Sequence, residues 1–222
     1  SAKRMGAEVT ILERNARVGK KLLATGNGRC NFTNITADAD CYLGSNPKFV
    51  HHALSAFSPK ETIRFFEKLG IQHKVEDRGK VFPMSDQASS MLDVLLYELN
   101  ASGVRIQCDS YVQDLEKRKG GFLIRTKDGK IYEADKVILA AGGKAMPSSG
   151  SDGNGLDLAR KLDHNVTDLF PALVQLMLDG PWFKRLNGVK FVGTAGILDR
   201  GKSVAGDRGD ILFTNYGVSG PP

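Results

Sequence analysis

The sequence predicts an α/β fold with a parallel sheet, followed by a smaller β-rich domain. Three observations predict it. A helix end at Gly6 leads into an apolar strand that ends on an acid, Glu13; an apolar run over 136–141 ends on two glycines; and the chain becomes rich in strands and glycine near residue 168. Helix, glycine and strand in this order form the second half of a βαβ unit. We therefore expect one domain over 1–167 and the start of a second over 168–222.

Length, composition and charge exclude several classes of protein. The 222 residues, 41% hydrophobic and 25% charged, suffice for domains with real cores. The longest aliphatic run, over 137–141, is far shorter than the roughly 20 apolar residues of a membrane span, so no membrane contact is expected. Three widely spaced cysteines predict neither a disulfide framework nor a zinc site and favour a reducing, cytoplasmic setting. A net charge of +6 leaves a nucleic-acid partner, an anionic cofactor or neither open.

Both ends of the sequence resemble the interior of a longer protein. Residues 1–6 have the pattern of a last helical turn, with Lys3 and Arg4 before Gly6. In dinucleotide-binding folds the acid that bonds the adenosine ribose follows a glycine fingerprint by about 20 residues. Glu13 comes too early for that, so we expect the fingerprint to precede residue 1. The chain also stops within an expected loop at Gly220-Pro-Pro222. These features predict an internal fragment.

Local signals between these ends predict alternating helices and strands. Residues 14–34 show no clear period and predict a long ordered loop. Asn46-Pro47 and the capping box Ser58-Pro-Lys-Glu61 each begin a helix. Further helices are expected over 86–101 and 156–162, a hairpin over 71–83, and strands over 104–108, 111–116, 122–126, 130–133 and 136–141. Asp128-Gly129 predicts a type I′ turn, and the last strand is expected to be buried, with a close backbone approach at its glycines.

The most informative segment runs from Gly19 to Asn31. Its three glycines let the backbone approach a ligand, while Lys20, Lys21 and Arg29 supply positive charge. Such a segment suits a diphosphate, and its place directly after the Glu13 strand favours that interpretation. The alternative is a flexible solvated loop.

Several motifs, in order, resemble one family. They are Glu13-Arg14, Gly19-Lys-Lys21, Thr25-Gly-Asn-Gly-Arg-Cys-Asn31, Val137-Ile-Leu-Ala-Ala-Gly-Gly143, Gly150-Ser-Asp-Gly-Asn-Gly155, Phe170-Pro-Ala-Leu173 and the stretch from Gly209 to Pro221. Together they resemble the aminoacetone oxidase-like (BaiN-like) family of FAD-dependent oxidoreductases. The sequence departs from the family pattern at Asn27, where a glycine is common, and at Asp163 and Asn215.

The resemblance implies a Rossmann-like FAD-binding domain of the two-dinucleotide-fold flavoprotein type, with a helical insertion. It implies that Glu13 holds the adenosine ribose, that Arg14 lies beside the adenine and that the backbone of Val112 meets the adenine edge. An ordinary core position in a strand is the alternative for Val112. The remaining cofactor-binding residues that the resemblance implies are Lys20, Lys21, Thr25, Gly26, Gly28, Arg29, Cys30, Asn31, Ala141, Gly142 and Gly143.

Catalytic residues are harder to assign. A dithiol site would need a second cysteine about five residues after Cys30, and Ile35 stands there, so Cys30 is expected to pack or to contact the cofactor. The neighbouring Arg29 can lower its pKa. Tyr216 and Ser219 are candidates for donating a proton or orienting substrate, with a loop turning on glycines as the alternative. The four histidines have no supporting partners, so neither a triad nor a metal is predicted.

Three functions remain open at this point. The resemblance implies that the flavin passes a hydride from N5 between a nicotinamide nucleotide, NAD(P)H, and a small unsaturated or carbonyl-type substrate. The alternatives are an RNA-binding module or a flavoenzyme that reduces an RNA base, and an inactive fragment without flavin. Residues 1–35 carry a charge of +5 and the rest of the chain only +1. This concentration favours an anionic cofactor over a nucleic acid.

Overall fold

The computed structural model describes residues 1–44, 46–171 and 173–220. Ala172 of the Phe170–Leu173 motif and Pro221–Pro222 of the expected terminal loop lie outside the described residues. The chain divides into two compact units, residues 1–166 and 167–222, and each is described by itself.

The first unit is organised around a parallel pair of strands. Strand β1 (Thr10–Leu12) follows a short 3₁₀ turn (Lys3–Met5) that ends at Gly6, whose φ of 91° is favourable only for glycine. It pairs in parallel with β5 (Arg105–Gln107), with Ile11 opposite Ile106. Parallel pairing over such a long connection is typical of α/β folds and confirms that part of the prediction.

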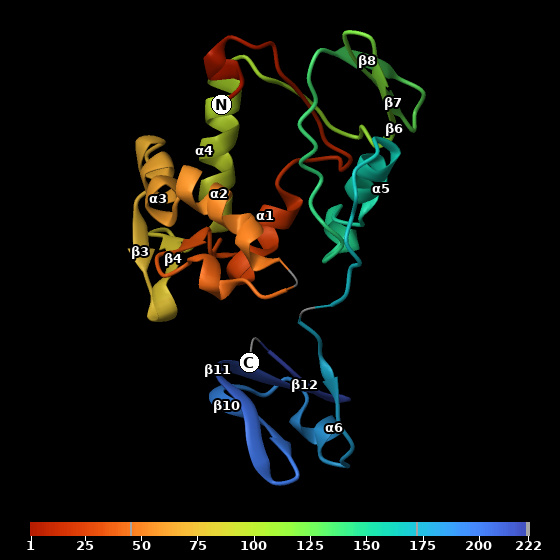
Figure 1. Cartoon of the computed structure of the whole chain (residues 1–222). Helices are drawn as coiled ribbons and strands as arrows, with labels where there is room; N and C mark the ends of the chain where they lie inside the picture. Colours follow the sequence, from red (N-terminus) through yellow and green to blue (C-terminus); the bar gives the residue numbers. More distant parts are fainter. Residues whose placement is uncertain (45, 172, 221–222) are drawn as a thin grey trace. The chain divides into compact units, whose positions relative to one another are not determined.

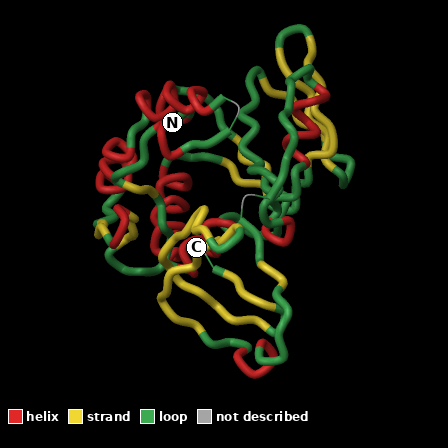
Figure 2. The backbone as a smooth tube through the Cα atoms, turned by 60° about the horizontal axis from the view of Figure 1, so that its bottom comes forward, coloured by secondary structure: helices red, strands yellow, loops and turns green. Residues whose placement is uncertain are grey.

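Helices fill the long connection between β1 and β5 (Figures 1 and 2). They are α1 (Lys20–Ala24), α2 (Val50–Ala56), α3 (Pro59–Lys68) and α4 (Ala88–Ala101), with 3₁₀ turns at Thr25–Gly28, Ala39–Cys41, Pro47–Phe49 and Asp77–Gly79. The expectation of a pure loop over 14–34 was therefore wrong. Leu22 and Leu23 pack against the core of Cys30, Ile71, Ala88 and Met91. Burial favours a helix here that is too short to show a helical period in the sequence.

The capping box before α3 is confirmed. The Ser58 hydroxyl accepts a hydrogen bond from the Glu61 amide at 3.2 Å and donates one to the Glu61 carboxylate. The helix ends before Gly70, which has a φ of 92°. Both signals are local in sequence, so they predict the bounds of the helix well.

A small antiparallel sheet packs with these helices. Its order is β2 (Thr33–Asn34), β4 (Lys80–Pro83), β3 (His73–Val75), which confirms the hairpin expected over 71–83. Val81 and Phe82 of β4 are buried. The central strand thus connects residues 33–34 to the hairpin.

A second antiparallel sheet follows β5. It contains β6 (Val112–Arg118), β7 (Gly121–Thr126) and β8 (Ile131–Ala134), and α5 (Asn154–Lys161) packs on β6 around Leu115, Ile124 and Leu158. The type I′ prediction was wrong, because only Gly129 of the turn has a positive φ, 85°. The Asp128 carboxylate binds the Thr126 hydroxyl and the Lys130 ammonium. These contacts favour a backbone with negative φ at Asp128, followed by a bulge at Gly129.

The segment over 136–141 is extended but is not a buried strand. Figure 1 draws it as plain coil between β8 and α5, and Ile138 is 82% exposed. Apolar residues predict a strand, but a strand also needs a neighbour for its hydrogen bonds. Within residues 1–44, 46–171 and 173–220, no strand pairs with this segment. The expectation of a buried central strand is therefore wrong for this chain.

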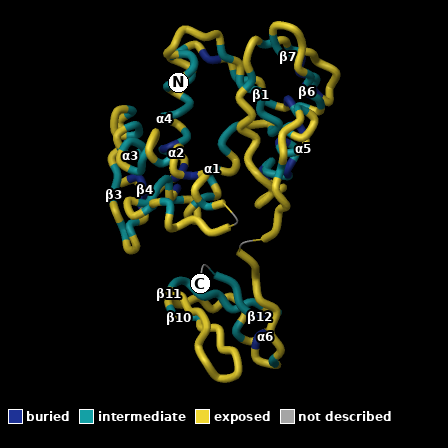
Figure 3. Tube along the Cα trace, in the orientation of Figure 1, coloured by how far each residue is buried: buried dark blue, intermediate teal, exposed yellow. Residues whose placement is uncertain are grey.

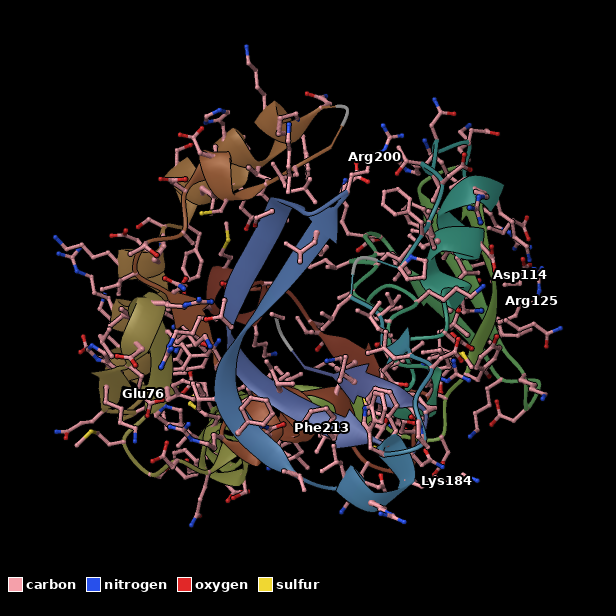
Figure 4. The ribbon with its side chains drawn as sticks, turned by 90° about the horizontal axis from the view of Figure 1, so that it is seen from below. Glu76, Asp114, Arg125, Lys184, Arg200 and Phe213 are labelled. Atoms are coloured by element: carbon pink, nitrogen blue, oxygen red, sulfur yellow. The ribbon has the colours of Figure 1, made fainter. Side chains whose placement is uncertain are left out.

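The second unit is rich in strands, as predicted. Its antiparallel sheet has the order β10 (Lys190–Asp199), β11 (Lys202–Thr214), β12 (Gly217–Ser219), β9 (Leu176–Met177), with the short helix α6 (Phe183–Leu186) beside β11. Phe213 on β11 (labelled in Figure 4) packs its ring against those of Phe183 and Phe191. Much of the β10–β11 hairpin is exposed (Figure 3). In neither unit does a described helix have the length and apolar character needed to cross a membrane.

Replacing Ser58 by alanine tests the capping box. The Ser58→Ala variant leaves the Glu61 amide without its acceptor, so its free energy of unfolding should fall by about 1 kcal/mol. Ser55→Ala is the matched control, because the Ser55 hydroxyl only bonds carbonyls within α2; its effect should stay below about 0.5 kcal/mol. Urea unfolding followed by circular dichroism measures both, and equal losses would contradict the capping role.

A pair of truncations tests the packing of the 136–141 segment. Leu158 is 2% exposed, and Leu158→Ala should lower the free energy of unfolding by about 2–5 kcal/mol. Ile138→Ala removes a side chain that is already in solvent and should cost less than about 0.5 kcal/mol. The same urea titrations apply, and a loss of several kcal/mol for Ile138→Ala would show that the segment is packed.

Candidate functional site

Glu13 lies directly after β1, and the backbone there stays paired beyond the strand. The Glu13 amide donates to the Gln107 carbonyl at 2.9 Å, and the Ser110 amide donates to the Glu13 carbonyl at 2.8 Å. Its Oε1 accepts hydrogen bonds from the amide and the side chain of Asn15, at 2.8 and 2.7 Å. Across the described parts of the chain, Oε2 has no hydrogen-bond partner, so it remains able to accept one from a hydroxyl group.

Arg14 connects the end of β1 to the loop that precedes α5. Its guanidinium lies 4.6 Å from the centre of the Tyr111 ring and forms an ion pair with Asp152 at 2.5 Å. Its Nη1 also donates to the Gly150 carbonyl at 3.4 Å, and Asn15 Nδ2 donates to the Ser149 carbonyl at 3.1 Å. The hydrogen bond from Arg14 lowers the pKa of Asp152 below its ordinary value of 3.8.

The 149–155 loop also meets the segment 141–143. The Gly153 amide donates to the Gly143 carbonyl at 3.1 Å. A Cβ on Gly155 would lie 2.8 Å from the Cβ of Ala141, so only glycine permits this approach. The structure thus brings Glu13 and Arg14 together with Ala141, Gly142 and Gly143 through this loop. Residues 141–143 are exposed, so their backbone is accessible.

Val112 begins β6, the edge strand of its sheet. Its side chain packs against the core of Leu115, Ile124 and Leu158, and the strand register shifts between Val112 and Asp114. Val112 therefore occupies an ordinary core position in its strand. A cofactor contact through its backbone stays a prediction.

Lys20 and Lys21 lie in the first turn of α1. Gly19 has a φ of 80°, and a Cβ there would lie 2.5 Å from a methyl group of Leu92, so a bare backbone lets α1 pack on α4. Both lysines are exposed, as is Arg17, and within the described residues none of the three forms an ion pair. Positive charge is therefore left uncompensated at this place.

Residues 25–31, here called the glycine loop, reverse the chain after α1. Gly26, Asn27 and Gly28 have φ values of 55°, 56° and 84°. A Cβ on Gly26 would lie 2.8 Å from the Asn31 amide nitrogen. Asn27 is the non-glycine residue of these three, and asparagine is among the residues that adopt this conformation most readily.

Two side chains stabilise the glycine loop locally. The Thr25 hydroxyl donates to the Leu22 carbonyl at 2.6 Å at the end of α1. With its amide oriented so that the nitrogen faces these acceptors, the Asn31 side chain donates to the carbonyls of Thr33 and Val81, at 2.9 and 3.1 Å. Both groups are predicted to contact the cofactor, and that role stays a prediction.

Arg29 is surrounded by acids. It forms ion pairs with Glu76 and Asp86, and its guanidinium lies 4.1 Å from the centre of the Phe82 ring. Lys74 binds the same two acids. The pKa of Glu76 is lowered mainly by its hydrogen bond from Arg29 and further by that from Lys74. The pKa of Asp86 is lowered mainly by its hydrogen bond from Lys74 and further by that from Arg29.

Cys30 packs in the core, which is one of the two roles expected for it; the other was contact with the cofactor. It is 4% exposed, and burial raises the pKa of its thiol. The expectation that Arg29 lowers this pKa was wrong, because the Arg29 guanidinium is engaged with Glu76 and Asp86 and the thiol is desolvated.

Tyr216 and Ser219 belong to the second unit. Tyr216 lies in the two-residue turn between β11 and β12, and its hydroxyl donates to Gln175 Oε1 at 2.5 Å. Ser219 pairs with Leu212 in the sheet. A Cβ on Gly217 would lie 2.1 Å from the Leu176 carbonyl oxygen, so glycine is required where β12 pairs with β9. The catalytic roles of both residues stay predictions.

Sequence reasoning missed five residues that organise these surroundings. Asp152, Asn154 and Tyr111 surround Arg14, with Asn154 Nδ2 donating to the Tyr111 hydroxyl at 2.9 Å. Glu76 and Asp86 hold Arg29. The dense glycines of 150–155 could have indicated Asp152, but no local pattern indicates the two acids. Among the described residues, no group of three or more His, Cys, Asp or Glu could hold a metal ion.

Residues 1–219 match the family described as "HI0933-like protein Rossmann domain". The chain belongs to this HI0933-like family. The match confirms both the Rossmann-like fold class and the family that the motifs predicted. It covers both units, from the turn before β1 to the end of β12.

Named relatives are similar over nearly the whole chain. A 3-dehydro-bile acid delta(4,6)-reductase of Clostridium scindens is 44% identical over 97% of this chain and 52% of its own length. Ribosomal RNA dihydrouridine synthases of Escherichia coli and Haemophilus influenzae are 30% and 28% identical, over 97% and 98% of this chain and 53% and 54% of their own lengths. The chain therefore spans about half the length of these relatives.

The Arg14–Asp152 pair makes a titration prediction. Because the pKa of Asp152 is lowered from 3.8, the ionised pair stabilises the fold above that pH, and this stabilisation is lost as the pH falls through the lowered value. Arg14→Gln should raise the pKa of Asp152 toward 3.8, as measured by NMR titration. Arg160→Gln, which removes an exposed partner of Asp157, is the control and should leave Asp152 unchanged. An unchanged Asp152 in Arg14→Gln would contradict the pairing.

Proposed function

We propose that the chain binds FAD and belongs to an FAD-dependent oxidoreductase. The observation that carries this proposal is the placement of Glu13. Its carboxylate follows a parallel strand of a Rossmann domain, Asn15 holds one oxygen, and the other is able to accept a hydrogen bond. An acid at this position of a Rossmann domain binds the ribose hydroxyls of an adenine dinucleotide.

The neighbouring residues fit the rest of such a cofactor. A diphosphate needs positive charge that no acid has already neutralised, and Arg17, Lys20 and Lys21 provide it. It also needs bare backbone, which Gly26 and Gly142 supply at positions where a Cβ would crowd Asn31 and Ser151. Arg14, whose guanidinium lies 4.6 Å from the centre of the Tyr111 ring, offers a planar cation for the adenine.

The chemistry divides between cofactor and protein. Bound FAD would supply electron transfer, accepting a hydride from NAD(P)H and delivering it from N5 to an unsaturated or carbonyl-type substrate. The chain's residues bind and orient: Glu13 accepts from the ribose, and the lysines of α1 offset the diphosphate charge. The name of the Clostridium scindens relative, a reductase, supports reduction of a small organic substrate as the reaction.

Reduction of an RNA base is the second candidate. Two relatives are named ribosomal RNA dihydrouridine synthases, which favours this reaction over an RNA-binding module without catalytic activity. In that case RNA is the partner, and its affinity for the protein should fall steeply with salt. The absence of RNA binding at low salt would remove this candidate and leave the small-molecule substrate.

FAD titration of the chain tests the first proposal. FAD should bind, with a change in flavin fluorescence, and more tightly than riboflavin, which lacks the adenosine and diphosphate. Lys20→Gln/Lys21→Gln should weaken FAD binding by roughly tenfold at low ionic strength, since each exposed ion pair contributes up to about 1 kcal/mol, and salt should shrink the difference.

The control for this titration is Lys117→Gln/Lys119→Gln. It removes the same charge from the β6–β7 hairpin and should leave FAD affinity within about twofold at moderate ionic strength. Failure of the unmodified chain to bind FAD would favour the alternative of an inactive fragment without flavin. Equal weakening in both double variants would show that only net charge matters.

A further inference from the structure

Four charged side chains form a closed cluster beside the glycine loop. Arg29 Nε and Nη2 donate to Asp86 Oδ1 at 2.9 and 2.7 Å, and Nη2 also bonds Glu76. Lys74 Nζ bonds both acids. Glu76 lies just after β3 (labelled in Figure 4), and Asp86 lies between β4 and α4. Two cations therefore meet two anions, and the cluster has no net charge.

This arrangement distinguishes Arg29 from the lysines of α1. Its guanidinium is fixed by two carboxylates and by the Phe82 ring, 4.1 Å from its carbon. Lys20 and Lys21 have no such partners among the described residues. A cation that is already neutralised adds little attraction for a diphosphate, so Arg29 is better suited to hold the loop than to bind an anion.

Backbone strain occurs on both sides of the cluster. Asn27 and Cys30 in the glycine loop and Asp86 in the turn before α4 have φ values of 56°, 63° and 53°. This conformation is costlier for Cys30 than for Asn27 and Asp86, because asparagine and aspartate adopt it more readily than other non-glycine residues. The Arg29–Asp86 bonds join the two strained segments across 57 positions of sequence. Each segment thus helps to fix the other.

We propose that Asp86 is a positioning residue that acts through Arg29 to keep the glycine loop in its folded conformation. The loop's contact with FAD rests on the proposed function, whereas the effect of Asp86 on the loop does not. Without the carboxylate, Arg29 loses two of its hydrogen bonds. The glycine loop then loses its polar link to the turn before α4 and keeps the packing of Cys30 against Ala88 and Met91.

The proposal and a direct phosphate contact predict opposite signs. If Arg29 bound the diphosphate itself, removing Asp86 would free its charge and tighten FAD binding. If Asp86 positions the loop, removing it loosens the loop and weakens FAD binding. The sign of the change therefore separates the two roles.

The test uses Asp86→Asn in the full chain. Asparagine tolerates a φ of 53° and keeps the size of the side chain, so the variant removes the charge with little added strain. Hydrogen exchange without FAD is read at the amides of Arg29 and Cys30, which bond Gly26 and Thr25, and of Phe32, which bonds Val81. These amides should exchange about two- to fivefold faster, as expected for a partly exposed ion-pair network. Amides of β7 should not change.

FAD affinity is the second readout. It should weaken by a similar factor in Asp86→Asn. Asp128→Asn removes an acid that pairs with Lys130 in the β7–β8 turn and should change neither readout. Glu76→Gln removes the other carboxylate at an unstrained position and should act in the same direction, so it replaces Asp86→Asn if that variant does not fold.

Unchanged exchange in the glycine loop, or tighter FAD binding, would overturn the proposal. Faster exchange throughout the first unit would also overturn it, because that would show a general loss of stability. If the unmodified chain does not bind FAD, the proposed function fails, and the exchange measurement alone decides the role of Asp86.

Discussion

The first unit depends on the parallel pairing of β1 with β5. Backbone hydrogen bonds continue that pairing beyond the strands, joining Glu13 to Gln107 and Ser110. They place Tyr111 beneath the Arg14 guanidinium, and Arg14 in turn binds the loop before α5 through Asp152. A pairing of three residues per strand thus supports the place where Glu13, Arg14 and the exposed glycines after residue 141 come together.

Elements whose signals are local were predicted well from sequence. The capping box at Ser58, the glycine stop at Gly70 and the hairpin before Pro83 all lie where residue chemistry alone placed them. The errors share a physical origin, because each depends on side-chain or strand contacts that the local residue pattern does not reveal. Burial of Leu22 and Leu23 creates α1, the Thr126 and Lys130 contacts of Asp128 decide the turn, and the 136–141 strand lacks a neighbour.

The charge of residues 1–35 shows the same limit in the candidate site. Its concentration favoured a site in a small region of the chain, but it could not show which cations are neutralised. Arg4 pairs with Glu98, and Arg14 pairs with Asp152. Arg29 pairs with both Glu76 and Asp86. All four acids lie far from their partners in sequence. Among the described residues, the cations of 1–35 without an ion pair are Lys3, Arg17, Lys20 and Lys21, and the last three lie around the start of α1. Sequence analysis found these cations but could not separate them from the paired ones.

The uncovered segment after β8 also affects how the chain behaves at high concentration. A short, extended run of Val137, Ile138 and Leu139 with no charge inside it has the composition of segments that stack into cross-β aggregates. Lys136 and Lys144 flank this run, and Gly142-Gly143 interrupts it, which are the features that natural sequences use to oppose such stacking. The same backbone that is accessible to a ligand is thus also accessible to a strand of another molecule, and the flanking lysines oppose that contact.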